Sequence, residues 1–274
     1  MRGRYKKTPS QFWPTLKYLG LTVAFIVVNK LFESMFPKDF VLTEEFEKMP
    51  FLSSQMYQQG VFVSIRYFYY IVFALTNGCI NASGLGYSGM RYGDDGPHEW
   101  ETVNSCDFYK VETAQSLIVA FQGWNQQIHV WLKNYVQDRL YEVGARPSGK
   151  AVLTTFAVSA LWHGLYPSYF LVFGFAAIIC EVSKDFHKRA DFFESLGLDT
   201  EQLRKKVSSW LTFYVCSYMC IIFSLLEMGK IETFVRATKG IPIILTMVTF
   251  TICRAIGFGK KPRDAAEESE KKSQ

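Results

Sequence analysis

Charged side chains are scarce in this chain, and they are not gathered in any one segment. Lys, Arg, Asp and Glu make up 20% of the 274 residues, and the net charge of +5 is spread over the stretches that separate apolar runs. A nucleic-acid-binding protein concentrates its basic side chains along one face. We therefore expect no nucleic acid among the partners of this protein.

Residue patterns for metal, disulfide and phosphate binding are also lacking. Among the 6 cysteines no pair has the Cys-x-x-Cys spacing typical of zinc sites. The loop 94–101 contains acidic residues and His98, but its glycines and proline are more typical of a solvated loop than of a metal site. The glycine-rich stretch 83–89 is not followed by the Gly-Lys-Ser/Thr of a phosphate-binding loop. The sequence predicts no metal site and no disulfide framework.

Apolar and aromatic residues, by contrast, are abundant and fall in blocks. Hydrophobic residues make up 49% of the chain, with 24 Phe and 15 Tyr. The clearest block, 207–226, is uncharged over roughly the 20 residues that cross a bilayer core. Weaker candidates are 16–28, 61–80, 151–180 and 241–258, of which 151–180 is expected to form two tilted segments that meet near 164–167. The pattern predicts an all-α, polytopic membrane protein with about five or six membrane helices, some short or re-entrant.

The two ends of the chain carry signals of topology. No small-residue cleavage site follows residue 28, so the first apolar run is expected to be an uncleaved anchor. A membrane domain is expected over 1–259, and a disordered, cytosolic tail over 260–274. Lys271 and Lys272 look like a dilysine retrieval signal of endoplasmic-reticulum membrane proteins, although a solvated charged tail explains them equally well. The basic cluster 204–206 predicts that the start of the 207–226 span faces the cytosol.

The segment 124–135 has the period of a helix. Its apolar residues, which begin at Trp124 and end at Tyr135, recur at helical spacing and define one face. Asn125 and His129 are four residues apart and are therefore expected to share another face. Taken alone, this pattern is that of an amphipathic helix at the membrane interface, where aromatic residues are favoured.

His163 is the most informative single residue, because it lies inside the apolar stretch 151–180. An ionisable side chain at membrane depth is a candidate functional residue. The alternative is a buried neutral imidazole that is hydrogen-bonded to a neighbouring helix. A neutral imidazole can take a proton from an alcohol near neutral pH, and the amide of Asn125 can stabilise a developing oxyanion. Together, the two side chains suit acyl transfer from a thioester to a hydroxyl group.

The same residues carry a family resemblance. Trp124-Asn125, the stretch from His129 to Tyr135, and Trp162-His163-Gly164 resemble the signature of the membrane-bound O-acyltransferase superfamily, especially its lysophospholipid acyltransferase branch. The stretch 83–87 is similar to a segment that precedes this signature in the branch. The resemblance covers roughly residues 9–184.

The resemblance implies an activity and a set of site residues. Asn125 and His163 correspond to the catalytic pair, and His129, Trp124 and Trp162 are the expected substrate-binding residues. The reaction is transfer of a long-chain acyl group from acyl-CoA to the free hydroxyl of a lysophospholipid, in the endoplasmic-reticulum membrane, with no metal or redox cofactor. Basic side chains between 133 and 150 are candidates for attracting the phosphates of acyl-CoA.

Two departures from the family pattern keep alternatives open. Ser168 stands where the family usually has glycine, between Pro167 and Tyr169. Family members are also longer, with additional N-terminal membrane helices, so the chain is expected to be a fragment or a shortened form. Acylation of a sterol, a diacylglycerol or a protein by the same residues is one alternative. A catalytically silent scaffold or a transport subunit is another.

Overall fold

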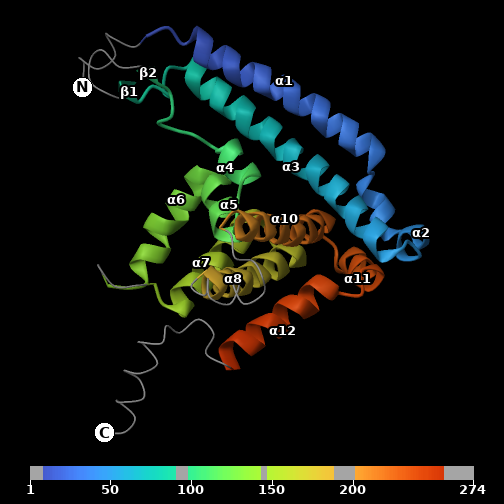
Figure 1. Cartoon of the computed structure of the whole chain (residues 1–274). Helices are drawn as coiled ribbons and strands as arrows, with labels where there is room; N and C mark the ends of the chain where they lie inside the picture. The colour runs from blue at the N-terminus through green and yellow to red at the C-terminus, as the bar shows by residue number, and fades with distance from the viewer. Residues whose placement is uncertain (1–8, 91–97, 143–146, 188–200, 256–274) are drawn as a thin grey trace, which may run out of the picture.

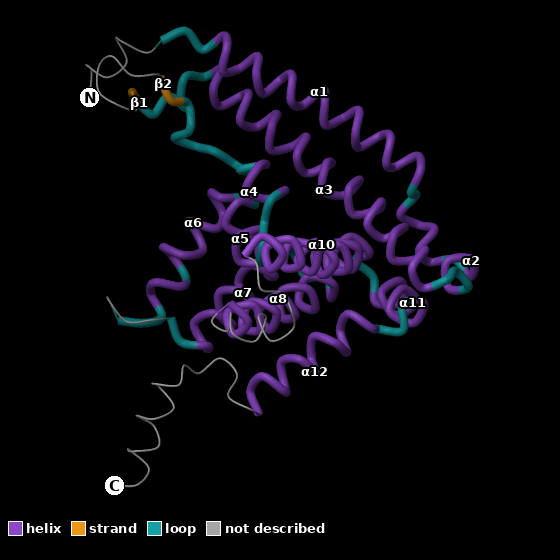
Figure 2. The backbone as a smooth tube through the Cα atoms, viewed as in Figure 1, coloured by secondary structure: helices purple, strands orange, loops and turns teal. Residues whose placement is uncertain are grey.

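A computed structural model of the chain describes residues 9–90, 98–142, 147–187 and 201–255 (Figure 1). Most of the described residues are helical, and two strands of two residues each form a small antiparallel pair (Figure 2). The expectation of an all-α, multi-pass membrane protein is confirmed. The predicted tail, 260–274, lies outside the described residues, as do the acidic residues at 94 and 95.

In chain order the elements are α1 (Phe12–Met35), η2 (Lys38–Leu42), α2 (Glu44–Glu47), α3 (Phe51–Ala82), β1 (Gly89–Met90), β2 (His98–Glu99), α4 (Phe108–Glu112), α5 (Leu117–Gly123), α6 (Gln126–Tyr135), η3 (Gln137–Arg139), α7 (Gly149–His163), α8 (Pro167–His187), α10 (Glu201–Leu225), α11 (Met228–Ala237) and α12 (Ile241–Ala255).

Three of the described helices are long and apolar enough to cross a membrane: Phe12–Leu42, Phe51–Ala82 and Lys205–Leu225. A fourth span is possible if α11 and α12, which are bent by 82° at their junction, act together. The sequence pattern predicted five or six membrane helices. The difference lies mainly in 151–180, which forms two helices. Helix α7 has 15 residues, and the apolar part of α8, Pro167–Val182, is shorter than a full span. The break between them lies near 164–167, as the sequence predicted.

A glycine and a proline produce the break between α7 and α8. Gly164 ends α7 with a φ of 130°, which side chains with a Cβ rarely adopt. Pro167 then occupies the first position of α8, where its missing N–H is not needed. His163 is the last residue of α7, so this break places it at the junction of two helices.

The long helices α1 and α3 form an antiparallel hairpin along one side of the molecule, and α10 packs between this hairpin and α8 (Figure 1). Between α1 and α3 the chain turns through η2 and α2, where Thr43 caps α2 by accepting the N–H of Phe46. The main apolar core lies between these helices and includes Val61 of α3, Ala176 of α8 and Ile221 of α10. The helices α4 to α6, which carry the Trp124-Asn125 motif, pack beside α3 and α7.

Candidate active site

Asn125 lies just before helix α6 and not within it. Its backbone is left-handed, with φ 44° and ψ 54°, and its carbonyl accepts the N–H of His129 at 3.1 Å. The prediction that Asn125 and His129 share a helix face was therefore wrong, because Asn125 does not have helical backbone angles. Its side-chain amide makes no hydrogen bond to the described residues, including the helix that it precedes. The amide is therefore available to a substrate.

Trp124 is held by aromatic residues of α3. Its ring lies 5.5 Å from Tyr69, 5.8 Å from Tyr70 and 5.3 Å from Phe73, measured between ring centroids. These contacts belong to a second, smaller hydrophobic cluster that also contains Cys106 and Val111. Trp124 therefore fixes the chain just before Asn125, and its ring is in contact with protein on several sides. This packing assigns Trp124 a structural role beside the substrate-binding role that the sequence suggested.

His129 lies one turn into α6. Partial burial, together with the charges of Lys110 and Lys133, lowers the pKa of His129 below its ordinary value. Its imidazole is therefore neutral at physiological pH, and it can act as a hydrogen-bond donor and acceptor without adding charge. No described contact joins His129 to His163.

His163 is surrounded by aromatic rings from three helices. Its ring stacks on Phe173 of α8 at 5.1 Å and meets Phe223 of α10 edge to face at 5.2 Å. Tyr169 of α8 lies 5.5 Å away. Among the described residues no group donates or accepts a hydrogen bond at the imidazole. The alternative of a structural histidine bonded to a neighbouring helix therefore has no support, and both ring nitrogens are available to a ligand.

Trp162 precedes His163 and meets its ring edge to face at 4.8 Å. The side chain is 50% exposed, as are other large apolar side chains of this region, such as Leu161 and Leu165. In a membrane protein such side chains face lipid or a partner segment. The structure therefore places Trp162 beside His163, but on the outer side of the described helices.

A hollow lies beside aromatic neighbours of His163 and Trp124, and its described lining includes neither His163, Trp124 nor Asn125. It has a volume of about 650 Å³, and Tyr169 and Phe223, which contact His163, line it together with Tyr69, which contacts Trp124. Two residues that contact His163 and one that contacts Trp124 therefore line the same hollow. The two motifs, which are separated by 38 positions, approach one cavity through aromatic neighbours. No described hydrogen bond or ring contact joins Asn125 to His163 directly.

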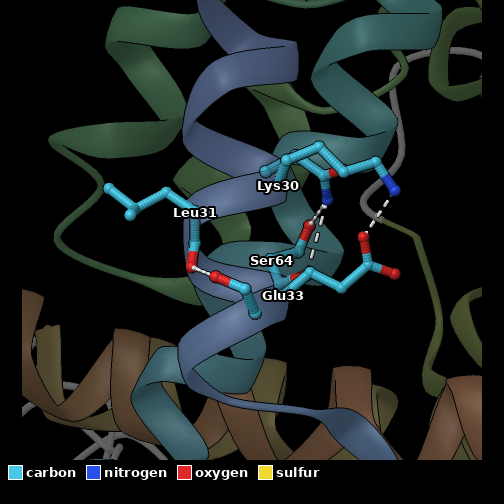
Figure 3. A network of polar contacts seen from close by, with 6 residues as sticks. Lys30, Leu31, Glu33 and Ser64 are labelled. Atoms are coloured by element: carbon cyan, nitrogen blue, oxygen red, sulfur yellow. Dashed lines mark hydrogen bonds and ion pairs between the residues drawn. The ribbon is translucent and has the colours of Figure 1, made fainter.

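The other end of the hollow is charged. Lys30 and Glu33 of α1 and Lys38 and Asp39 of η2 line it, close to the turn between α1 and α3. Figure 3 shows Lys30 and Glu33, which form an ion pair with 2.6 Å between Nζ and Oε2, beside Ser64 of α3. Lys38 donates to the backbone carbonyl of Ser224 at 3.3 Å and so ties η2 to the end of α10. The hollow is therefore polar at one end and aromatic at the other.

Arg66 of α3 carries a charge that the sequence pattern did not single out. Its side chain is 9% exposed and pairs with Glu112 of α4, with 2.9 Å between Nε and Oε1. The rings of Phe62 and Phe213 lie 4.6 Å and 5.2 Å from its guanidinium carbon. The signal that could have revealed it was its position in the middle of the apolar run 61–80, since a charge there requires a partner. The sequence pattern did not single out Tyr69 and Phe223, because aromatic residues are common in apolar spans.

Among the described residues no group of three or more His, Cys, Asp or Glu side chains is arranged to hold a metal ion.

Comparisons with known proteins agree with this geometry. The model of the membrane-bound O-acyltransferase family matches residues 4–226, which include both motifs and the helices around the hollow. A protein of Schizosaccharomyces pombe named lysophospholipid acyltransferase is 32% identical over 229 residues, which are 81% of this chain and 44% of that protein. Lysophospholipid acyltransferase 1 of Arabidopsis thaliana is 25% identical over 228 residues, or 83% of this chain and 49% of its own length.

A third relative, membrane-bound glycerophospholipid O-acyltransferase 1 of Mus musculus, is 32% identical over 166 residues, which are 60% of this chain and 32% of that protein. The chain thus spans about half the length, or less, of these curated relatives. The family match covers most of the chain and includes His163 and Asn125. This chain belongs to the membrane-bound O-acyltransferase family.

Proposed function

We propose that this chain forms the catalytic part of an acyl-CoA:lysophospholipid O-acyltransferase, in which His163 and Asn125 act on one substrate. The observation that carries the proposal is the unpartnered His163 imidazole, whose ring neighbours Tyr169 and Phe223 line a hollow that also contains charged residues of α1 and η2. The names of three relatives, which refer to lysophospholipid or glycerophospholipid acyl transfer, support the same reaction.

In the proposed reaction His163 acts as general base. Its unpartnered imidazole removes the proton from the free glycerol hydroxyl, and the alkoxide oxygen attacks the thioester carbonyl of a long-chain acyl-CoA. The new C–O ester bond forms, the C–S bond breaks, and the coenzyme A thiolate takes up a proton as it leaves.

Asn125 is proposed to bind the oxygen on which negative charge develops. An amide N–H donor is effective in this role if it is held rigidly and makes no competing hydrogen bond. The Asn125 amide makes no competing hydrogen bond in the described structure. Its left-handed backbone and the packed Trp124 beside it hold it in place. His129 and Trp162 are proposed to contact the substrate beside this pair.

The two ends of the hollow match the two ends of a lysophospholipid better than they match a sterol. Lys30 and Lys38 can bind the phosphate, while Glu33 and Asp39 can bind a cationic headgroup. The aromatic end suits the glycerol and the start of the acyl chain. A sterol or a diacylglycerol has no charge for the polar end of this hollow, so the structure favours the phospholipid over these alternatives.

Acyl-CoA is proposed as the acyl donor, with basic residues near α6 and α7 close to its phosphates. Lys133 is engaged with Asp138, with 2.7 Å between Nζ and Oδ2. Arg139 lies over the ring of Tyr135, and Lys150 is exposed at the start of α7. Arg139 and Lys150 are therefore the better candidates for the coenzyme phosphates. The endoplasmic-reticulum membrane is the proposed location, and imaging of the tagged chain against markers of that membrane checks it.

The test is incorporation of labelled oleoyl-CoA into a panel of lysophospholipids. Membranes of cells that lack this activity would carry the chain, its His163→Ala variant, or the control variant Leu153→Ala on the exposed side of α7. General-base catalysis contributes about 10²- to 10⁴-fold, so His163→Ala is expected to lower transfer to that extent while Leu153→Ala retains it. Equal transfer by all three variants would contradict the assignment of the base. No transfer by any inserted variant would favour the scaffold alternative.

A further inference from the structure

One face of α3 holds the segment that carries Asn125. Arg66, Tyr70, Phe73 and Asn77 recur at intervals of three or four residues, so they lie along one side of the helix. Tyr70 and Phe73 contact Trp124, and Arg66 pairs with Glu112 at the end of α4. Asn77 continues this face one turn beyond Phe73.

Asn77 is buried, with 3% of its surface exposed, and its amide makes two hydrogen bonds to the chain before α4. Its Oδ1 accepts the backbone N–H of Ser105 at 3.0 Å, and its Nδ2 donates to Oδ1 of Asn104 at 2.8 Å. A leucine or alanine at this position could make neither bond. The amide therefore fixes both the position and the orientation of the 104–105 segment.

The 104–105 segment in turn holds the start of α6. The carbonyl of Ser105 accepts the backbone N–H of Gln126 at 2.8 Å, and the carbonyl of Asn104 accepts from the side chain of Gln127 at 3.2 Å. These two residues directly follow Asn125. A chain of hydrogen bonds therefore runs from Asn77 of α3 to the backbone of residues 104–105, and from there to the first residues of α6, which follow the catalytic amide.

Two more contacts hold the other side of Asn125. The N–H of Asp107 donates to the carbonyl of Gly123 at 2.9 Å. Burial raises the pKa of the Cys106 thiol to about 12, and a hydrogen bond from the backbone of Asn125 opposes this shift. Cys106 is therefore an uncharged thiol in contact with the Asn125 backbone. The segment 104–107 thus holds the chain before, at and after Asn125.

The backbone of Asn125 needs such support. A residue with a Cβ in the left-handed region is strained, and the conformation persists only where the surrounding structure imposes it. If the start of α6 moved, the amide of Asn125 would lose its direction before any other part of the site was disturbed. An oxyanion donor that is displaced by even an ångström loses much of its effect.

We propose that Asn77 is a positioning residue for Asn125: through Asn104 and Ser105 it fixes the start of α6 and thereby the direction of the catalytic amide. This inference rests on the proposed function of Asn125. The two proposals can still be tested separately. The hydrogen bonds of Asn77 predict that the backbone at the start of α6 is held in place, whether or not the chain transfers acyl groups.

The test compares Asn77→Leu, Asn104→Ala and Thr76→Val in the full chain. Leu has the same number and branching of side-chain heavy atoms as Asn, although it is larger, and it cannot form the two bonds. Asn104→Ala removes one bond from the other partner if Asn77→Leu fails to fold. Thr76 is the adjacent residue on α3 but bonds only to the carbonyl of Val72, so Thr76→Val is the matched control. Hydrogen–deuterium exchange of peptides within 104–135 and transfer kinetics with oleoyl-CoA are both measured.

For Asn77→Leu we expect faster exchange at the start of α6, unchanged exchange in α8, and kcat lower by about tenfold or more with a much smaller change in KM for oleoyl-CoA. Asn104→Ala is expected to show the same pattern more weakly, and Thr76→Val none of it. Unchanged exchange in 104–135 and unchanged kcat in Asn77→Leu would overturn the proposal, as would an equal loss across all helices. If even the unsubstituted chain transfers no acyl group, the proposed function fails, and the exchange data alone decide whether Asn77 holds α6.

Discussion

At the scale of single residues, the two proposed catalytic side chains are distinguished by what they do not contact. The side chain of Asn77, for example, donates to Asn104 and accepts the backbone N–H of Ser105. The imidazole of His163 and the amide of Asn125 have no such partner among the described residues. Unpaired polar groups are suited to a ligand, and these two are also the residues that carry the family resemblance, which is why we assign the chemistry to them.

The sequence predicted the identity of this pair but not its local geometry. The Trp-His-Gly and Trp-Asn patterns identified His163 and Asn125, because the resemblance rests on those residues. Helical periodicity placed Asn125 on α6, whereas the structure places it before the helix with a left-handed backbone. Periodicity could not reveal this, because the contacts that impose the conformation come from the distant segment 104–107 and from α3.

Ser168 gives a prediction at the same scale. It stands where the family usually has glycine, it is fully buried, and its hydroxyl has no hydrogen-bond partner in the described structure. A buried hydroxyl without a partner is costly, so Ser168→Ala is expected to stabilise the protein by about 1 kcal/mol. Thermal unfolding of the purified variants in detergent checks this. A lower unfolding temperature for Ser168→Ala would mean that the hydroxyl has a partner in the membrane-embedded protein.

At the scale of helices, the buried polar residues of α3 organise the site. The sequence predicted α3 as a membrane span containing a charge, but it could not show that the charge is neutralised by α4, because Arg66 and Glu112 are 46 positions apart. The break between α7 and α8 was predictable from a glycine and a proline. The contact of His163 with α10 was not predictable from the sequence. Pairings between distant helices are set by packing, which composition does not specify.

The ion pair between α3 and α4 gives a prediction at this scale. Arg66→Leu leaves Glu112 without its partner, and the expected loss of stability is about 2 kcal/mol, less than for a fully buried pair because Glu112 is 34% exposed. The double change Arg66→Leu with Glu112→Leu is expected to recover much of this loss, since no lone charge remains. Chemical unfolding of the unchanged protein and of the two variants measures these differences in stability. Equal stability of Arg66→Leu and the unchanged protein would show that the pair does not connect the two helices.

At the scale of the whole molecule, the α1–α3 hairpin packs against the α7–α8–α10 group (Figure 1). The hairpin and η2 contribute the charged residues and Tyr69 to the hollow, and α8 and α10 contribute Tyr169 and Phe223, which contact His163. The class of the fold followed from composition and the positions of the apolar blocks. The hollow could not be predicted from the sequence, because its walls come from regions of the chain that are far apart in sequence.

The central claim is that His163 and Asn125 act together on one substrate. A double-mutant cycle tests it most directly: transfer from oleoyl-CoA to a lysophospholipid is measured for His163→Ala, Asn125→Ala and the double variant, each confirmed to be inserted in the membrane. Residues that act as a unit give non-additive losses, so the double variant is expected to be little worse than His163→Ala alone. Losses that multiply in the double variant, or activity retained by His163→Ala, would contradict the account.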